Sequence, residues 1–262
     1  MALEENRKAL AWGRGADRYR LLGQLVLTYA RQARPGDTTL RAPDHTAGGA
    51  EIAIPLDPGL SPSENAQQYF RRYAKARAAA RAAPVRIAQL EAEVGALREA
   101  LVQIENAASP DDLWEIQADL AAAGVVRHGP RGRPPVRSGP RRFRAGDGST
   151  ILVGRSGREN DHITFHEAGP DDLWFHARGV AGAHVILKAG GVPAEATITL
   201  AARAAAYYSE NRSAHQVAVD CVARKHVRRL RGAAAGAVTY SGERTLMVAP
   251  GLPANPAGNP HA

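Results

Sequence analysis

Four histidines stand in a segment that is also rich in carboxylates and aromatic residues, residues 160–187. Imidazoles at suitable spacing can hold a metal ion. Here successive histidines are separated by 4, 10 and 8 residues, which matches no compact ligand pattern, and no carboxylate is placed as a regular third ligand: His162, His166, His176 and His184. The spacing therefore predicts no metal site and no cofactor.

Acid–base and nucleophilic chemistry have no better support in the sequence. The carboxylates of Asp111-Asp112 and Asp171-Asp172 are adjacent in the chain, and adjacent acids do not form a general acid–base pair. The first pair is typical of a helix cap and the second of a turn. The chain has no P-loop, no GxSxG elbow and no dinucleotide fingerprint. We therefore expect no catalytic residues and a protein that is not an enzyme.

The strand predicted at Leu173 to Ala177 separates its side chains onto two faces. Alternation places Leu173, Phe175 and Ala177 on one face and Trp174 with His176 on the other. If the second face is open, the Trp–His pair suits stacking on a base or a ribose. The alternative is a second buried layer under a helix, and the sequence leaves both open.

Positive charge is concentrated in two short stretches. The chain carries a net charge of +8, with seven arginines in residues 127–144 and five lysines or arginines in residues 224–231, and neither stretch contains an acid. The remainder is therefore slightly negative. Clustered arginine indicates a polyanionic partner. The alternative is that these charges only solvate a linker and a surface.

The first half of the chain reads as helices around a small hairpin. Residues 1–33 predict two helices broken at residues 13–15, and residues 38–40 and 51–56 predict two strands. Ser61 is a predicted N-cap, with Pro62 in the first helical position and Glu64 completing a capping box. Pro84 is expected either to kink this helix or to separate two helices.

Beyond Pro84, aliphatic residues form a heptad seam with spacings of 3, 4, 3, 4 and 3: Ile87, Leu90, Val94, Leu97, Leu101 and Ile104. A second helix begins at Ser109-Pro110-Asp111-Asp112 and stops at Gly124. We interpret residues 61–126 as an antiparallel coiled-coil arm with one long and one short limb. Burial of the seam against the domain's own body is the alternative.

The second half reads as a flexible linker followed by a compact domain. Residues 127–144 are rich in Arg, Pro and Gly and lack periodicity. In residues 145–250 a helix at 195–211 lies among short strands, which predicts an α+β fold with a mostly antiparallel sheet and one main helix. The strands are expected at 151–153, 162–165, 173–177, 183–187, 216–222, 237–240 and 245–248. Residues 251–262 read as a disordered tail.

The composition of the chain indicates its cellular compartment. No apolar run reaches the roughly 18 residues of a membrane span, and the acidic, amphipathic start is not a signal peptide. The single cysteine, Cys221, excludes an internal disulfide and a cysteine-based zinc site. We expect a cytoplasmic protein that does not contact a membrane.

Several blocks in the second half resemble the NFACT-R domain of the NFACT family. They are GRSGRENDHIT (154–164), DDLWFHARGVAGAHVIL (171–187), AAYYSENR (205–212), VAVDCVARKHVRRLRGAAAGAVTY (217–240) and TLMVAP (245–250). Upstream, residues 52–77 and 109–124 resemble the family's coiled-coil arm. The signature residues within these blocks are Asn160, Asp161, Asp172, Trp174, His176, Gly182 and His184. The resemblance covers most of residues 15–250.

The resemblance implies an RNA-binding factor of bacterial ribosome-associated quality control. Such a factor binds the obstructed large ribosomal subunit, with its rRNA and tRNA, and supports the addition of alanine tails to stalled chains. The family's large N-terminal domain is not matched, so residues 1–60 are interpreted as its remnant and a separately encoded N-terminal half as a further partner. Two positions depart from the usual pattern: Glu159 stands where Gln is common, and Ala183 where Ser is usual.

On this interpretation the RNA contacts are expected from the basic residues of the compact domain: Arg155, Arg158, Lys188, Arg224, Lys225, Arg228 and Arg229. Such side chains hold phosphates through bidentate or point-charge contacts. The family's older association with fibronectin leaves a surface adhesin as one alternative. A truncated, non-functional remnant is the other.

Overall fold

The computed structural model describes residues 1–34, 36–129, 131–132 and 139–253. The chain divides into two compact units, Met1–Glu91 and Ala92–Ala262. Both combine helices with antiparallel strands, so the α+β expectation is confirmed. The helix α3 (Pro62–Glu105) runs without interruption through Pro84 and contributes residues to both units, so Pro84 does not separate two helices.

The first unit holds three helices and a hairpin. Helices α1 (Ala2–Arg14) and α2 (Ala16–Thr28) meet at Gly15, as the sequence predicts, and a short 3₁₀ turn follows at Ala30–Gln32. Strands β1 (Thr39–Asp44) and β2 (Ala50–Pro55) pair antiparallel. The predicted capping box begins α3: the Ser61 amide donates to Glu64 Oε2 at 2.8 Å, and Ser61 Oγ accepts from the Glu64 amide at 3.3 Å.

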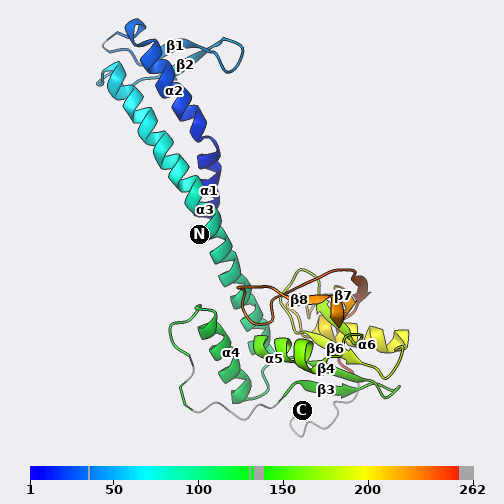
Figure 1. Cartoon of the computed structure of the whole chain (residues 1–262). Coiled ribbons are helices and arrows are strands. Elements are labelled where there is room, and N and C mark those ends of the chain that lie inside the picture. The colour runs from blue at the N-terminus through cyan, green and yellow to red at the C-terminus, as the bar shows by residue number, and fades with distance from the viewer. Residues whose placement is uncertain (35, 130, 133–138, 254–262) are drawn as a thin grey trace. The chain divides into compact units, whose positions relative to one another are not determined.

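Helices α1 and α2 lie antiparallel to the first part of α3 (Figure 1). A Cβ on Gly13 would lie 2.4 Å from Ala80 Cβ, so glycine at that position allows the two helices to approach closely. In the middle of α1, Arg7 forms a 3.0 Å ion pair with Glu91 of α3. Residues 1–60 therefore contribute two helices that lie along α3, together with the β1–β2 hairpin.

The second unit contains the last part of α3, helix α4 (Pro110–Ala122) and a six-stranded sheet with strand order β10-β7-β5-β6-β4-β3, in which every pairing is antiparallel. Its strands are β3 (Arg141–Arg144), β4 (Thr150–Val153), β5 (Leu173–Ala177), β6 (Val185–Lys188), β7 (Val217–Ala223) and β10 (Arg244–Val248). A separate two-stranded ribbon joins β8 (Val227–Arg229) to β9 (Val238–Tyr240). Helix α6 (Glu195–Tyr207) is four residues shorter than predicted.

Two predictions in this unit are wrong. The segment expected to be a strand at 162–165 is helical, because Ser156 caps α5 (Gly157–His162) by accepting from the Glu159 amide, and a π-helical turn, Ile163–Glu167, continues it. The predicted linker at 127–144 ends earlier, because Arg141–Arg144 pair with β4 as an edge strand. The remainder of that linker falls partly outside the described residues, as does most of the predicted tail at 251–262.

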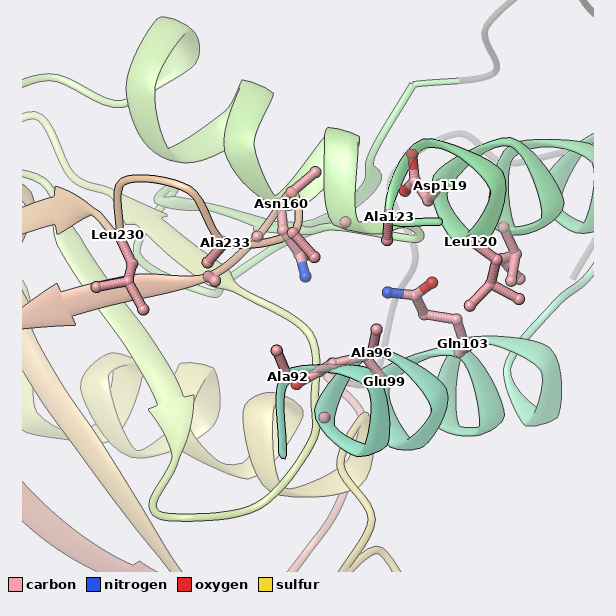
Figure 2. A pocket seen from close by; sticks show the side chains of 18 of the residues that line it. Ala92, Ala96, Glu99, Gln103, Asp119, Leu120, Ala123, Asn160, Leu230 and Ala233 are labelled. Atoms are coloured by element: carbon pink, nitrogen blue, oxygen red, sulfur yellow. The ribbon is translucent and has the colours of Figure 1, made fainter. Parts of the chain in front are cut away.

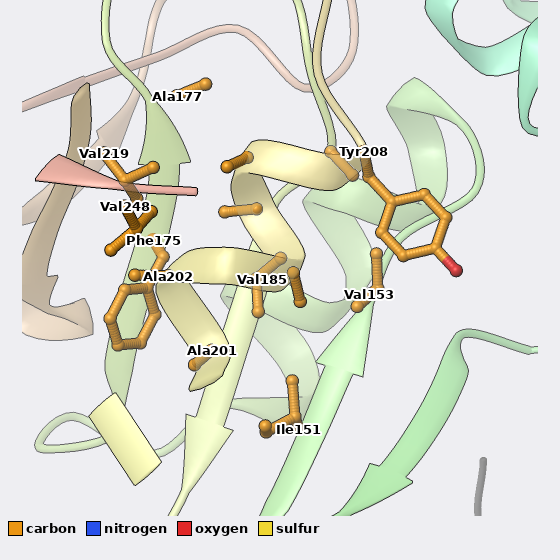
Figure 3. Packing of buried hydrophobic residues seen from close by; sticks show 14 of the residues in the cluster. Ile151, Val153, Phe175, Ala177, Val185, Ala201, Ala202, Tyr208, Val219 and Val248 are labelled. Carbon is orange, nitrogen blue, oxygen red and sulfur yellow. The ribbon is translucent and has the colours of Figure 1, made fainter. Parts of the chain in front are cut away.

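Helix α6 covers one face of the sheet through small residues (Figure 3). Ala201, Ala202 and Ala205 are fully buried there, and alanine side chains allow the helix to lie close to the strands. The strands contribute larger aliphatic and aromatic side chains to the same cluster, among them Ile151, Val153, Phe175, Val185, Val219 and Val248. This is the face on which alternation placed Phe175 and Ala177.

The opposite face has its own core. Leu152, Trp174 and Ile186 from the sheet pack with Ile163 of the π-helical turn and Val227 of β8. The segments α5, the π-helical turn and the β8–β9 ribbon therefore bring side chains onto this face, and the residues resembling the family signature are concentrated here.

Candidate nucleic-acid interface

Trp174 lies at the centre of the second face and has no exposed surface. Its ring stacks on His176 with centroids 5.6 Å apart and an interplanar angle of 11°, and it meets His184 edge-on at 5.1 Å. Tyr240 of β9 closes the cluster at 4.8 Å. The alternative of a second buried layer is thus confirmed for Trp174, although β8, β9 and the π-helical turn cover it rather than α6.

The two histidines of this cluster are held as neutral rings. Burial, followed by the neighbouring His176, lowers the pKa of His184 to about 3, and burial also lowers the pKa of His176. His184 Nδ1 lies 2.8 Å from the Thr164 hydroxyl, and His176 Nε2 donates to the Gly182 carbonyl at 3.3 Å. His184 is buried and His176 half-buried, and as neutral, hydrogen-bonded imidazoles they act as packing groups rather than as a cationic surface.

The other signature residues join loops to this face. Asn160 Oδ1 accepts from the His184 amide at 3.1 Å, and it lies so near Gly154 that a Cβ there would be 2.1 Å from it. Asp161 Oδ1 accepts from the Gly236 amide at 3.1 Å, which ties α5 to the loop before β9. Asp172 Oδ2 accepts from the Gly169 amide at 2.8 Å and closes the turn before β5.

The basic residues predicted to bind RNA do not all lie at the surface. Arg155 is buried and pairs with Asp112 of α4 at 3.4 Å, so it does not offer the free guanidinium that its prediction assumed. Arg158 is half exposed and pairs with Asp119 at 2.7 Å, which joins α5 to α4. Arg224 Nε donates to the Thr164 carbonyl at 2.8 Å. These three arginines have local structural partners that a sequence cannot reveal.

Lys188 is half-buried, whereas Lys225, Arg228 and Arg229 around β8 are exposed. Lys188 Nζ donates to the Glu167 carbonyl at 2.6 Å. Lys225 pairs with Asp171 at 2.8 Å, and both side chains are at least half exposed. Arg229 pairs with Asp161 at 3.3 Å and lies 4.7 Å from the centre of the Phe165 ring. Arg228 is exposed, and among the described residues it donates to backbone carbonyls alone.

Sequence reasoning left out one cation of this group, Arg231, which is also exposed. Together Lys225, Arg228, Arg229 and Arg231 form a basic surface on and beside β8, which we call the β8 basic surface. Lys225 and Arg229 have acidic partners, whereas Arg228 bonds only to neutral carbonyls, so its charge is the least compensated of these three. The prediction of a basic run contained the signal, because Arg231 belongs to the same acid-free segment.

A buried charge cluster was also missed. Asp220 lies in the apolar strand β7 and accepts from Arg178 Nε at 2.8 Å, from Tyr240 Oη at 2.8 Å and from Thr245 Oγ1 at 2.8 Å. Burial alone would raise the pKa of Asp220, but these hydrogen bonds hold it below its usual value. An aspartate inside the run VAVDCVA was the available signal. The cluster fastens β7 to β9 and β10.

A cavity of about 300 Å³ lies beside this face, between the last turns of α3, helix α4 and residues 230–237 (Figure 2). Its walls are mostly alanine and glycine. The amide nitrogen of Asn160 points into it, and Glu99 Oε2 in its wall accepts from the Gly182 amide at 3.1 Å. Burial raises the pKa of Glu99 to about 7.

The described residues offer no cluster of metal ligands, since no group of three or more His, Cys, Asp or Glu side chains among them is arranged to hold a metal ion. The helices of the described ranges include none that is long and apolar enough to cross a membrane.

The helical arm and the sheet domain with its basic ribbon define an NFACT-type chain with an RNA-binding module. Residues 2–135 match the family description "NFACT N-terminal and middle domains", and residues 140–236 match "NFACT protein RNA binding domain". The chain therefore belongs to the NFACT family, as the sequence resemblance indicated.

The relatives agree with this assignment. The chain is similar to proteins named "Rqc2 homolog RqcH" from Streptococcus suis (35% identity over 256 residues) and Bacillus subtilis (32% over 255 residues). Each match covers 95% of this chain but only 46% and 44% of the relative, so the chain spans less than half the length of these relatives. A solved structure, the C-terminal part of the fibronectin/fibrinogen-binding protein from Streptococcus suis, matches with 29% identity and a TM-score of 0.64, covering 95% of this chain and 89% of that one.

Proposed function

We propose that this chain is a cytoplasmic RNA-binding factor of ribosome-associated quality control. It binds the obstructed large ribosomal subunit through rRNA and tRNA and supports alanine tailing of stalled chains. The β8 basic surface carries the proposal, because exposed Lys225, Arg228, Arg229 and Arg231 lie within the segment that matches the family's RNA-binding domain. The relatives' name, a homologue of Rqc2, supports the same pathway.

The chain's role in that pathway is binding and positioning rather than chemistry. His184 and Trp174, which resemble family signature residues, are in the core, where they hold α5 and the β8–β9 ribbon in place. The proposed division of labour is that this core sets the shape of the ribbon and the exposed cations contact phosphates. Phosphate contacts give affinity and position without reading sequence.

The test is co-sedimentation of the protein with large ribosomal subunits over a series of salt concentrations. The variant Lys225→Glu/Arg228→Glu/Arg231→Glu should bind at least tenfold more weakly at about 100 mM salt. The slope of log K against log salt should also fall by about one for each phosphate that the variant no longer neutralises. These residues are exposed, so the melting temperature of the variant should change little.

The matched control is Arg203→Glu, which reverses an exposed charge on α6, the helix that packs on the other face of the sheet. It should bind subunits like the unmodified protein. The triple variant reverses three charges and the control reverses one, so equal weakening per reversed charge would mean that only net charge matters. Unchanged binding by the triple variant would remove the β8 basic surface from the proposal.

A second candidate function rests on the name of the structural relative, which is a fibronectin/fibrinogen-binding protein. Solid-phase binding of this chain to fibronectin discriminates between the two. Binding that saturates and survives the triple charge reversal would favour the adhesin, whereas weak binding that disappears with moderate salt would reflect the basic surface alone.

A further inference from the structure

The cavity between α3, α4 and residues 230–237 contains polar groups that the fold itself does not use (Figure 2). The Asn160 side chain is 3% exposed, and its Oδ1 accepts from the His184 amide. Its Nδ2 points into the cavity, and within the described ranges no hydrogen bond engages that nitrogen. Because a buried amide group without an acceptor destabilises a fold, a molecule in the cavity that supplies an acceptor is expected to bind there.

The α3 side of the cavity provides an acceptor. Glu99 is half-buried, and one of its carboxylate oxygens, Oε2, accepts from the Gly182 amide at 3.1 Å. No hydrogen bond among the described residues engages the other oxygen, Oε1. Gln103, one turn further along α3, also lines the cavity, and its side-chain amide is directed into it (Figure 2). The cavity therefore combines a carboxylate acceptor with amide donors.

The remaining walls of the cavity are apolar. Alanine and glycine predominate, and the larger side chains are Ile116 and Leu120 of α4 and Leu230. The volume of about 300 Å³ is at the lower end of the range for ligand pockets, about 300–1,000 Å³, so one small planar ring system fits. Apolar side chains against the faces of a ring, with polar groups at its edges, are how proteins hold a base that has left its helical stack.

Contacts between the walls hold these groups in place. Asp119 of α4 pairs with Arg158 of α5 at 2.7 Å. A Cβ on Gly157 would lie 2.6 Å from the Ala235 carbonyl oxygen, so the loop before β9 lies directly on the start of α5. Donors and acceptors that are fixed before a ligand arrives reduce the entropy lost on binding.

The cavity adjoins the β8 basic surface. Leu230 lines the cavity and stands between Arg229 and Arg231 in the chain, and its amide donates to the Ala237 carbonyl at 3.0 Å. Both arginines are exposed. A nucleotide whose base occupied the cavity would therefore have cations close to its phosphates, and phosphate contacts supply affinity and position.

We propose that this cavity binds one unpaired guanine base of an RNA whose phosphates contact the β8 basic surface, an inference that rests on the proposed RNA-binding function. Guanine has two neighbouring donors, the N1 and N2 groups, on one edge and two neighbouring acceptors, O6 and N7, on the next. Glu99 Oε1 accepts from the donor edge, and Asn160 Nδ2 donates to the acceptor edge. Adenine has a single donor group between two acceptors, so it satisfies a carboxylate less well.

The experiment uses the full chain and labelled nine-residue oligouridylates that carry guanine, adenine, inosine's base or uracil at the central position. Binding is followed by fluorescence anisotropy at pH 8, above the pKa of about 7 that burial gives Glu99, so that its carboxylate is ionised. Since a bidentate base contact is worth roughly a factor of five to one hundred, the guanine oligomer should bind about tenfold more tightly than the adenine and uracil oligomers. The inosine oligomer, which lacks the N2 donor, should be intermediate.

The matched variants are Glu99→Gln and Glu93→Gln. Glutamine at position 99 keeps an oxygen for the Gly182 amide but replaces the second acceptor by a donor, so the preference for guanine should disappear while the affinity for the uracil oligomer stays the same. Glu93 is an exposed residue of α3 that does not line the cavity, so its variant should keep the preference. Ala96→Phe, which fills the cavity, should remove it, and melting temperatures verify that all three variants are folded.

Three results would overturn the inference. The first is equal affinity of the unmodified protein for the guanine and uracil oligomers, and the second is a guanine preference that Glu99→Gln retains. The third is competition by free guanosine monophosphate as strong as that of the unlabelled oligomer, which would assign the cavity to a free nucleotide. Failure of the proposed function looks different, because Lys225→Glu/Arg228→Glu/Arg231→Glu would then bind every oligomer as the unmodified protein does.

Discussion

The two faces of the six-stranded sheet are built from alternate residues of the same strands, yet they are sealed by different chemistry. The face under α6 is closed by alanines of one helix against aliphatic strand residues. The opposite face is closed by a π-helical turn and a ribbon, and it contains polar groups that must each find a partner: Asn160, Thr164 and His184. The first face can be closed by any apolar side chains that pack closely, whereas the second needs particular hydrogen-bond donors and acceptors at fixed positions.

This difference explains where the residues that resemble the family signature lie. An apolar layer can exchange one aliphatic residue for another at small cost when volume is kept. In a buried hydrogen-bond network, each group left without a partner destabilises the fold by its full desolvation penalty. The signature residues Asn160, Trp174 and His184 belong to the second kind of layer, which supports the ribbon that carries the β8 basic surface.

The largest expected effect on this comparison is that of Trp174→Ala. Removing a fully buried tryptophan should cost about 3–5 kcal/mol of unfolding free energy, measured by urea denaturation. Trp174→Phe should cost less, because the indole nitrogen has no hydrogen-bond partner among the residues that the structure describes. If Trp174 instead stacked on RNA, Trp174→Ala would weaken subunit binding and leave the unfolding free energy almost unchanged.

Sequence patterns could determine the two faces but not what covers them. Alternation in Leu173 to Ala177 assigned each side chain to the correct face, and the N-caps Ser61 and Ser109 located the starts of α3 and α4. The cover of the second face was not predictable, because residues 162–165 alternate like a strand while the Ser156 cap makes them the end of a helix.

Long-range pairing accounts for the other misses. A heptad seam shows that a helix packs on α3 but not which helix, and α1 and α2, which lie along its first part, could not be identified from it. Arg155 reads as one more surface cation because its partner, Asp112, is 43 residues away in the chain. The strand β3 was hidden in an Arg- and Pro-rich segment whose pairing with β4 only the folded sheet reveals.

The polar face should also be the acid-sensitive one. In the unfolded chain an imidazole is protonated below a pKa of about 6.5, whereas folded His184 stays neutral until a pKa of about 3. Between these values the unfolded state binds more protons, so His184 makes the protein less stable as pH falls, and its contribution is fully favourable only above pH 6.5. The loss is about 2 kcal/mol at pH 5.

Two buried glutamates act in the opposite direction: burial raises the pKa values of Glu99 and Glu159 to about 7, so these groups stabilise the fold as pH falls. The contribution of His184 must therefore be isolated by comparing the unmodified protein with a variant. The difference in unfolding free energy between the unmodified protein and His184→Gln should shrink by about 2 kcal/mol from pH 7 to pH 5. Val219→Ala, under α6, should cost the same at both values. A difference for His184→Gln that does not depend on pH would contradict a neutral, buried imidazole.

The smallest expected effects come from the N-termini of α5 and α6. A side-chain N-cap is present at α5, on the polar face, and missing at α6, on the other face. On the polar face Ser156 caps α5, with its hydroxyl 3.2 Å from the Glu159 amide. On the α6 face the N-cap is Ala194, which has the extended backbone of a cap (φ −65°, ψ 147°) but no side-chain acceptor. Ser156→Ala should therefore destabilise by about 1 kcal/mol and Ala194→Ser should stabilise by a similar or smaller amount. Thermal denaturation of the two variants measures both effects. A lower melting temperature for Ala194→Ser would contradict the expected stabilisation of the N-terminus of α6 by a serine N-cap.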